Sequence, residues 1–251
     1  MAVDPPLVLM HFFGSSHREW DQVRARLAPD RRVLALDLPG FGDAAGRSPE
    51  DVAGMADDVQ RAIAVAALAS CVLVGHSMSG KVAAVLAARE PAWLRGLVLV
   101  TASPPSPEPM TDDAKAKLLA FDGSREAAAD YVDGITASRL PDDLRNLAID
   151  DAMRASLAAW NAWVTGGSQE DWAPRVGVLG VPTHVIAGAD DPSLGERIQR
   201  DRVLPHFPEA TLVVIDGGHA LPLENPDGLH REIASFAARL ASSFSSRRSF
   251  A

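Results

Sequence analysis

The sequence has 251 residues, of which 47 % are hydrophobic and 23 % charged, enough to bury the core of one large domain or of a domain with one sizeable insertion. With 24 Lys and Arg against 33 Asp and Glu, the net charge is −9, the wrong sign for binding a phosphate backbone or an anionic lipid surface. We therefore expect neither nucleic acid nor a membrane as a partner. The single cysteine, Cys71, excludes an internal disulfide and a cysteine-rich metal site.

The location of the protein is predicted from the same features. The first six residues contain no basic region followed by an apolar stretch, and no segment has the uninterrupted apolar length of a membrane-spanning helix. Cys71 falls in an apolar run, where a buried and unreactive thiol is typical. These features favour the reducing cytoplasm.

Six short apolar runs, each bounded by Gly, Pro, Ser or Asp, predict β-strands. The runs are residues 7–11, 33–37, 72–76, 97–101, 183–187 and 211–216. They are almost continuously apolar instead of alternating, which is typical of parallel strands covered by helices on both faces. The predicted fold class is therefore α/β, with a doubly wound, mostly parallel sheet of about six strands, an inserted helical cap, and the run 33–37 at an exposed edge.

Amphipathic stretches between the runs predict helices. Ser16 and Glu19 have the spacing of a capping box in front of an apolar helical face, and Ser48 with Pro49 is typical of a second helix start. A last apolar stripe at helical spacing closes the pattern, formed by Leu229, Ile233, Phe236 and Leu240.

Residues 103–175 interrupt the alternation, because they contain helical patterns and no predicted strand. We expect a helical cap at 103–175, inserted into a core formed by 1–102 and 176–251. Three of the five tryptophans, Trp160, Trp163 and Trp172, lie in this insertion. Trp160 and Trp163 are candidates for lining a substrate pocket, although any one of these rings could instead pack the cap helices together.

A candidate nucleophile follows the third run. Residues 75–80 read Gly-His-Ser-Met-Ser-Gly and lead into a helical pattern. A serine on a sharp turn from strand to helix is held above the sheet, provided that the residues two positions away are small. Ser77 meets this condition with Gly75 and Ser79, whereas Ser79 would have Lys81 in that place. Ser77 is the preferred nucleophile, with a simple helix cap as the alternative.

Serine needs a base to take its proton, and the base needs a carboxylate to orient it. His219 follows the last run, and Asp190 and Asp191 follow the run before it. Because the carboxyl ends of parallel strands share one edge of the sheet, Ser77, one of the two aspartates and His219 are expected to converge there. Each of these residues alone could serve only as a turn or capping residue.

An oxyanion intermediate requires backbone N–H donors, one of them from the residue after the nucleophile, Met78. The second donor is expected in the loop after the first run, residues 11–16.

These motifs together resemble the α/β-hydrolase superfamily, in the branch that has a serine nucleophile and a helical lid. The matching segments are residues 11–14, 37–42, 75–80, 188–192 and 218–219, in the order of that family. The resemblance implies Ser77, Asp191 and His219 as a catalytic triad, with Phe13 and Met78 as the oxyanion donors. It favours Asp191 because the acid of the family commonly sits three residues after the glycine and before a proline, but Asp190 remains an alternative.

One position departs from the family pattern. Phe12 stands where the family usually has glycine, and phenylalanine enters positive φ less readily. The oxyanion loop is therefore expected to differ in shape, and the ring of Phe12 or Phe13 to narrow the acyl pocket.

The function predicted from these residues is that of a serine hydrolase, resembling carboxylesterases, that cleaves a small, largely apolar ester or related acyl compound. The expected partner is thus a small-molecule acyl substrate. No metal-ligand motif or nucleotide-binding glycine pattern is present, so no cofactor and no metal are expected. The alternatives are a slowly hydrolysing ligand receptor or regulatory partner, motivated by Phe12, and carbon–carbon hydrolase, perhydrolase or hydroxynitrile lyase chemistry at the same triad. The oligomeric state is not predicted.

Overall fold

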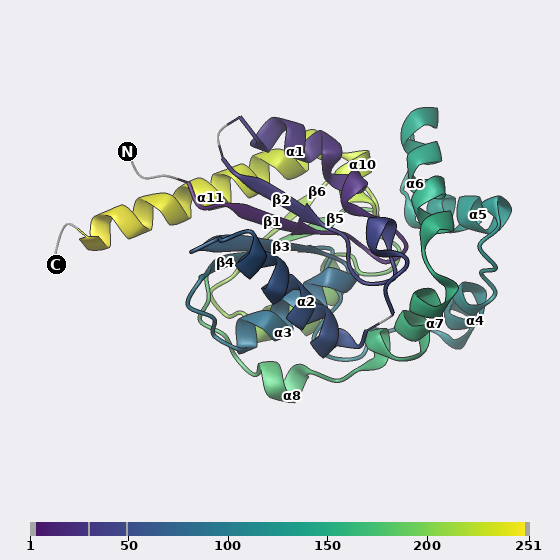
Figure 1. Ribbon diagram of the computed structural model, residues 1–251, viewed down its shortest axis with the longest axis horizontal. Helices are drawn as coiled ribbons and strands as arrows, with labels where there is room; N and C mark the ends of the chain where they lie inside the picture. Colours follow the sequence, from purple (N-terminus) through teal and green to yellow (C-terminus); the bar gives the residue numbers. More distant parts are fainter. Residues whose placement is uncertain (1–3, 30, 49, 249–251) are drawn as a thin grey trace.

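The computed structural model describes residues 4–29, 31–48 and 50–248, and its centre is a parallel sheet of six strands (Figure 1). The strand order is β2-β1-β3-β4-β5-β6, and every neighbouring pair is parallel. The strands are β1 (Leu7–Met10), β2 (Val33–Leu36), β3 (Cys71–His76), β4 (Leu94–Val100), β5 (Thr183–Gly188) and β6 (Thr211–Ile215). The predicted α/β class with a parallel sheet of six strands is confirmed, and β2 is an edge strand as expected.

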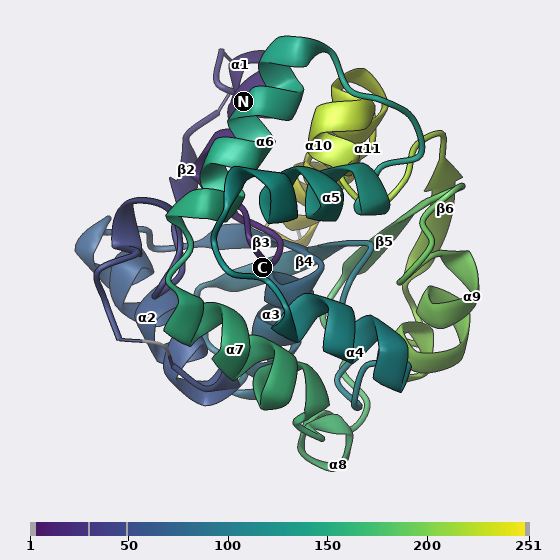
Figure 2. The ribbon, with the colours of Figure 1, turned by 90° about the vertical axis from the view of Figure 1, so that its right-hand side faces the viewer.

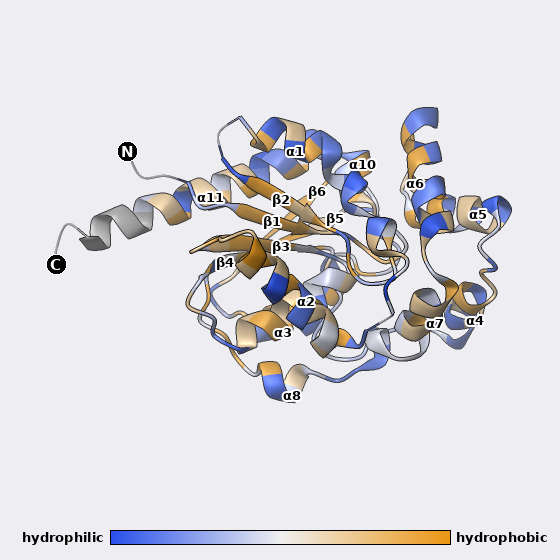
Figure 3. Cartoon of the chain, viewed as in Figure 1, coloured by the Kyte–Doolittle hydropathy of each residue, from blue (hydrophilic) through white to orange (hydrophobic). Residues whose placement is uncertain are grey.

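Alternate residues of the strands face two separate hydrophobic layers. Leu7 and Leu9 of β1 pack in the layer that also holds residues of α1 and α11, whereas Val8 and Met10 pack in the layer of α2 and α3. Figure 1 shows these two pairs of helices on opposite faces of the sheet, and Figure 3 shows the apolar strands between them. Because both faces are covered, the strands carry apolar residues at successive positions.

The helices of this core are mostly amphipathic. They are α1 (Asp21–Leu27), α2 (Val52–Val65), α3 (Met78–Ala88), α9 (Glu196–Ile198), α10 (Leu221–Glu224) and α11 (Pro226–Arg248), with 3-10 turns η1 (His17–Trp20), η2 (Gly42–Ala44) and η5 (Leu204–His206) and a π turn η4 (Gln199–Val203). All four residues of the last predicted stripe are buried, on α11.

One predicted helix start is correct in position but lacks the expected capping box, and the other is wrong. Ser16 caps η1 by accepting from the N–H of Arg18, but the Glu19 carboxylate does not return to Ser16, because it is bound to His76 and Phe12 in the interior. The second start lies at Asp51, whose carboxylate accepts from the N–H of Gly54. Ser48 precedes this cap, and position 49 lies outside the described residues.

All the segments between β4 and β5 are helical or irregular within the described chain. The helices are α4 (Asp112–Leu119), α5 (Arg125–Ile135), α6 (Asp142–Arg154), α7 (Leu157–Thr165), η3 (Gly167–Gln169) and α8 (Ala173–Val176). Figure 2 looks onto the carboxyl ends of the strands, with α4, α5, α6 and α7 in front of them. We refer to residues 103–175 as the insertion.

Cys71 is buried at the start of β3, and burial raises the pKa of its thiol to about 12. The thiol is therefore protonated and unreactive at neutral pH. Among the described helices, none combines the length and the apolar character needed to cross a lipid bilayer.

Candidate active site

Ser77 lies on the turn between β3 and α3, in a conformation that side chains rarely adopt, with φ 51° and ψ −117°. Two glycines permit this turn. A Cβ at Gly75 would lie 2.5 Å from the carbonyl oxygen of Ser79, and one at Gly80 would lie 2.5 Å from the Cβ of Ala102. The strained residue is held by the surrounding packing, which is common at functional sites.

The structure brings His219 and Asp191 to this turn from the ends of β6 and β5. His219 Nε2 lies 2.8 Å from Ser77 Oγ, and His219 Nδ1 lies 2.8 Å from Asp191 Oδ2. The side chain of Asp191 is fully buried, whereas Asp190 is exposed and does not contact His219. Of the two aspartates that the sequence left open, Asp191 is therefore the one that reaches the histidine.

Opposing electrostatic effects set the protonation of this pair. Burial alone would raise the pKa of Asp191, but His219 and the N–H groups of Ser193 and Leu194 lower it well below its usual value. Burial alone would lower the pKa of His219, but Asp191 in particular raises it above its usual value. Asp191 is thus ionised near neutral pH and can stabilise a positive charge on the imidazole.

Ser79, the rival nucleophile in the sequence, has a different position. Its buried hydroxyl accepts from the N–H of His76 at 3.0 Å and lies 2.8 Å from the carbonyl oxygens of Met10 and His11. These contacts fasten the Ser77 turn to the end of β1. Ser79 is therefore engaged with the backbone and does not face His219.

The loop after β1 presents the second expected oxyanion donor. In the described chain, no acceptor is found for the backbone N–H of Phe13 or for that of Met78, the first residue of α3. The positive φ in this loop falls on Gly14, at 73°, and not on Phe12. The substitution of the usual glycine at position 12 therefore does not force a phenylalanine into an unfavourable conformation.

Two side chains hold carbonyl groups of this loop, one from α5 and one from the loop itself. The Tyr131 hydroxyl, on α5, donates to the carbonyl oxygen of Phe13 at 2.6 Å. His11 Nδ1 lies 2.7 Å from the carbonyl oxygen of Phe12, while its Nε2 accepts from the N–H of Leu38 at 3.0 Å. The insertion and the segment that follows β2 thus both fix the loop that carries Phe13.

Sequence reasoning missed a buried pair behind the site. His76 Nε2 donates to the carbonyl oxygen of His219 at 2.8 Å, and His76 Nδ1 lies 2.9 Å from Glu19 Oε1. Glu19 Oε2 accepts from the N–H of Phe12 at 3.4 Å. Both side chains are completely buried, so Glu19 connects the loop after β1 to the backbone of His219. The spacing of Glu19 after Ser16 pointed to a helix cap, and no local signal indicated this contact.

A cavity of about 300 Å³ opens at Ser77 and His219. Phe13 and Trp163 line it. Phe12 does not, since its ring lies behind the site against His76, with ring centroids 5.1 Å apart. Trp160 lines a neighbouring cavity of about 380 Å³ between α4, α5 and α7. Two of the four aromatic rings proposed around the pocket therefore lie on the cavity that contains Ser77.

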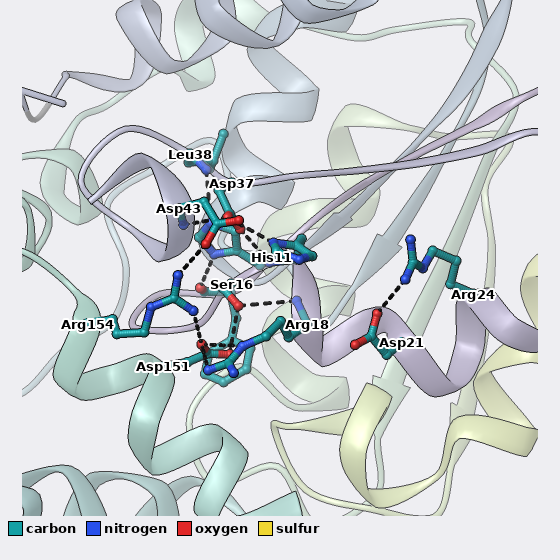
Figure 4. Close-up of polar contacts among 12 residues, drawn as sticks. His11, Ser16, Arg18, Asp21, Arg24, Asp37, Leu38, Asp43, Asp151 and Arg154 are labelled. Carbon is teal, nitrogen blue, oxygen red and sulfur yellow. Dashed lines mark hydrogen bonds and ion pairs between the residues drawn. The ribbon is translucent and has the colours of Figure 1, made fainter. Parts of the chain in front are cut away.

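A network of ion pairs and hydrogen bonds joins the insertion to the core beside the loop after β1 (Figure 4). The fully buried carboxylate of Asp151, on α6, accepts from Ser16 Oγ at 2.7 Å and from Arg18 Nε at 2.9 Å. Arg154 bridges Asp151 and Asp43. Helix α5 thus contacts the loop after β1 at Phe13, and helix α6 contacts it at Ser16 and contacts the following η1 at Arg18.

One group of side chains in this region has the ligand types of a metal site. His17, Asp37 and Asp43 offer ligand atoms within 4.8 Å of one another. Protein groups already use the two carboxylates, since Asp37 accepts from His17 and from the N–H of Asp43, and Asp43 pairs with Arg154. Asp37 and Asp43 are thus parts of the network drawn in Figure 4.

The doubly wound sheet carries a serine turn, a histidine and a carboxylate at its carboxyl edge, which is the arrangement expected for a hydrolase. A model of the alpha/beta hydrolase family matches residues 7–232, and the chain belongs to this family. The family resemblance expected from the sequence motifs is confirmed.

Relatives in this family have different activities. A 2-succinyl-6-hydroxy-2,4-cyclohexadiene-1-carboxylate synthase of Serratia proteamaculans is 27 % identical over 247 residues, which are 92 % of each chain. A pimeloyl-(acyl-carrier protein) methyl ester esterase of Yersinia pseudotuberculosis is 37 % identical over 101 residues, 40 % of this chain and 38 % of that one.

Solved structures show the same fold. An esterase from Exiguobacterium antarcticum superimposes with a TM-score of 0.82 at 19 % identity, covering 95 % of this chain and 93 % of that one. The enol-lactonase from Burkholderia xenovorans has a TM-score of 0.79 at 21 % identity, covering 93 % of this chain and 91 % of that one. At these identities the likeness concerns the fold and leaves the substrate open.

Proposed function

We propose that this hydrolase cleaves a small, largely apolar ester or related acyl compound through a triad of Ser77, His219 and Asp191. The observation that carries the proposal is the chain of two 2.8 Å contacts from Ser77 Oγ through His219 to Asp191. A serine hydroxyl becomes nucleophilic when an adjacent base takes its proton and a third group orients that base.

The reaction begins when Ser77 Oγ attacks the carbonyl carbon of the ester and His219 Nε2 takes the hydroxyl proton. The resulting oxyanion accepts from the backbone N–H groups of Phe13 and Met78. His219 then gives its proton to the departing alcohol oxygen, which leaves an acyl-enzyme on Ser77. His219 next activates a water molecule that attacks the acyl-enzyme, and the acid product and the free hydroxyl of Ser77 are released.

In this proposal the insertion at 103–175 acts as a cap on the core formed by 1–102 and 176–251. Support comes from the cavity at Ser77, since residues of the insertion, among them Met110, Leu118 and Trp163, form much of its wall. A volume of about 300 Å³ is at the small end of ligand pockets, which favours a small-molecule acyl substrate.

A regulatory receptor that hydrolyses slowly is the second reading of the same fold. The sequence feature that suggested it was Phe12 in the oxyanion loop. This support weakens because the positive φ of the loop falls on Gly14 and not on Phe12. Fast labelling of Ser77 by a fluorophosphonate with ordinary turnover of a p-nitrophenyl ester favours the esterase, whereas labelling with negligible turnover favours the receptor.

The decisive variant is Ser77→Ala. We expect it to lose fluorophosphonate labelling and to lower kcat by a factor on the order of 10⁶, because the attacking atom is removed. Circular dichroism should show an unchanged fold. Full ester turnover by Ser77→Ala contradicts the proposal.

A matched pair of variants tests the acid of the triad. Asp191→Asn should lower kcat about 10⁴-fold, because an amide favours the wrong imidazole tautomer. Asp190→Asn, at the exposed neighbouring position, should leave kcat within about twofold, as surface substitutions usually have small effects. The reverse ranking would assign the role to Asp190.

A further inference from the structure

The cavity at Ser77 contains a carboxyl group that the proposed reaction does not use. Glu108 lies between β4 and α4 and lines the cavity together with Ser77 and His219. Its backbone N–H donates to the carbonyl oxygen of Ser168 at 2.9 Å, which fixes its position against η3 within the insertion. Its carboxyl group also acts electrostatically on His219, so a substrate bound in this cavity lies near that charge.

No Lys or Arg balances Glu108 in the wall of the cavity, and the one titratable base there is His219, which must be neutral to accept the proton of Ser77. Among the described residues that line it, Glu108 is the only carboxylic acid, none is Lys or Arg, and most of the others are apolar. The nearby Lys81 is buried outside this wall, with its ammonium held by the carbonyl oxygens of Gly167, Ser168 and Glu170 at 3.2, 2.9 and 3.2 Å. Its three N–H donors are thus engaged by backbone and not free for a substrate.

Burial raises the pKa of the Glu108 carboxyl, although Ser103, Lys81 and His219 act in the opposite direction. An ionised Glu108 repels a second negative charge, and a protonated Glu108 can donate a hydrogen bond to a neutral acceptor. In both forms, an anionic substrate would be taken out of water into a mostly apolar cavity without a Lys or Arg to pair with it while His219 is neutral.

We propose that Glu108 makes this site select against anionic substrates, so that the enzyme takes esters whose acyl part is neutral or carries an amine. The inference rests on the proposed function and narrows its substrate class. Such a preference for uncharged or cationic substrates would differ from the chemistry named for the Serratia relative, a synthase of a carboxylate.

Three methyl esters of similar length test the charge preference: methyl hexanoate, monomethyl adipate and methyl 6-aminohexanoate, followed by proton release at pH 7.5. The wild-type chain should cleave monomethyl adipate with a kcat/KM at least about tenfold below that of methyl hexanoate, and below that of the amine. Equal values for the anionic and neutral esters overturn the inference.

The variant Glu108→Gln keeps the shape of the side chain and removes its charge. It should reduce the preference for methyl hexanoate over monomethyl adipate by about tenfold and lower the relative rate of the amine. Glu209→Gln, at an exposed turn outside the cavity, is the matched control and should keep the wild-type ratios. An unchanged preference in folded Glu108→Gln also overturns the inference.

A binding measurement on the wild-type chain does not depend on the folding of any variant. Phenylboronic acid should inhibit at least about tenfold more tightly than 4-carboxyphenylboronic acid, and equal inhibition counts against a role of Glu108. A failed triad gives a different result, since a wild-type chain that cleaves none of the esters and is not labelled at Ser77 contradicts the proposed function itself.

Discussion

At the scale of single residues, the site depends on groups held in costly states by their neighbours. Ser77 has positive φ, and Asp191 and His219 are buried ionisable groups that satisfy each other. Strain of this kind costs on the order of 1–3 kcal/mol and persists where packing over-determines the conformation. Here the determinants are Gly75, which allows close approach of the Ser79 backbone, and Gly80, which allows close approach of Ala102.

The pH dependence of the reaction follows from the raised pKa of His219. Asp191, Glu108 and Glu19 all favour the protonated imidazole, whereas the base must be neutral to accept the proton of Ser77. The acid limb of kcat/KM should therefore have its midpoint above the ordinary histidine pKa of 6.5. Glu108→Gln should move this midpoint to lower pH, because one negative charge is lost. A midpoint at or below 6.5 in the wild-type pH profile contradicts this assignment.

At the scale of elements, the loop after β1 is the part of the site that depends on the insertion. The hydroxyl of Tyr131 on α5, the only tyrosine in the chain, donates to the carbonyl oxygen of Phe13. The ring of Phe13 packs on that of Trp160, with centroids 4.3 Å apart. Because this loop supplies one proposed oxyanion donor, the docking of α5 and the geometry of the donor are linked.

Tyr131→Phe tests this link. The ring remains and only the hydrogen bond to Phe13 is lost, so kcat should fall by about two- to tenfold, corresponding to about 0.5–1.5 kcal/mol, with little change in KM. Thr165→Val, which removes an exposed hydroxyl on α7 away from the cavity, should leave both constants unchanged. Steady-state kinetics on a short ester separates kcat from KM, and an unaltered kcat in Tyr131→Phe refutes the link.

At the scale of the whole molecule, the insertion is fastened to the core by a buried carboxylate. Asp151 is fully buried and receives Ser16 and Arg18 from the core, while the Arg18 side chain is 30 % exposed. Loss of Asp151 would leave these donors unpaired in the interface, although Arg18 can regain part of its hydration.

Asp151→Ala should lower the free energy of unfolding by about 2 kcal/mol, less than for a wholly buried pair, because Arg18 is partly hydrated. Asp150→Ala removes the neighbouring carboxylate, which forms an exposed pair with Arg125, and should cost less than about 0.5 kcal/mol. Urea unfolding followed by tryptophan fluorescence compares the two. Equal losses of stability would contradict the special role of Asp151.

The sequence by itself determined the fold class and the candidate serine and histidine. Continuous apolar runs separated by amphipathic stretches predict a covered parallel sheet, and the carboxyl ends of such strands share one edge, so the chain order from Ser77 to His219 was informative. The turn at residues 75–80 was equally readable, because its small residues are adjacent in the sequence.

Only the tertiary structure showed that Asp191, and not Asp190, contacts His219. It also showed that Glu108 lines the Ser77 cavity, whereas Phe12 and Trp160 do not. Glu19, which the sequence predicted to cap a helix, instead contacts His76 in the structure. Each of these outcomes depends on which distant segment fills the space beside a side chain. That competition between local hydrogen bonding and long-range packing leaves no periodic trace in the sequence.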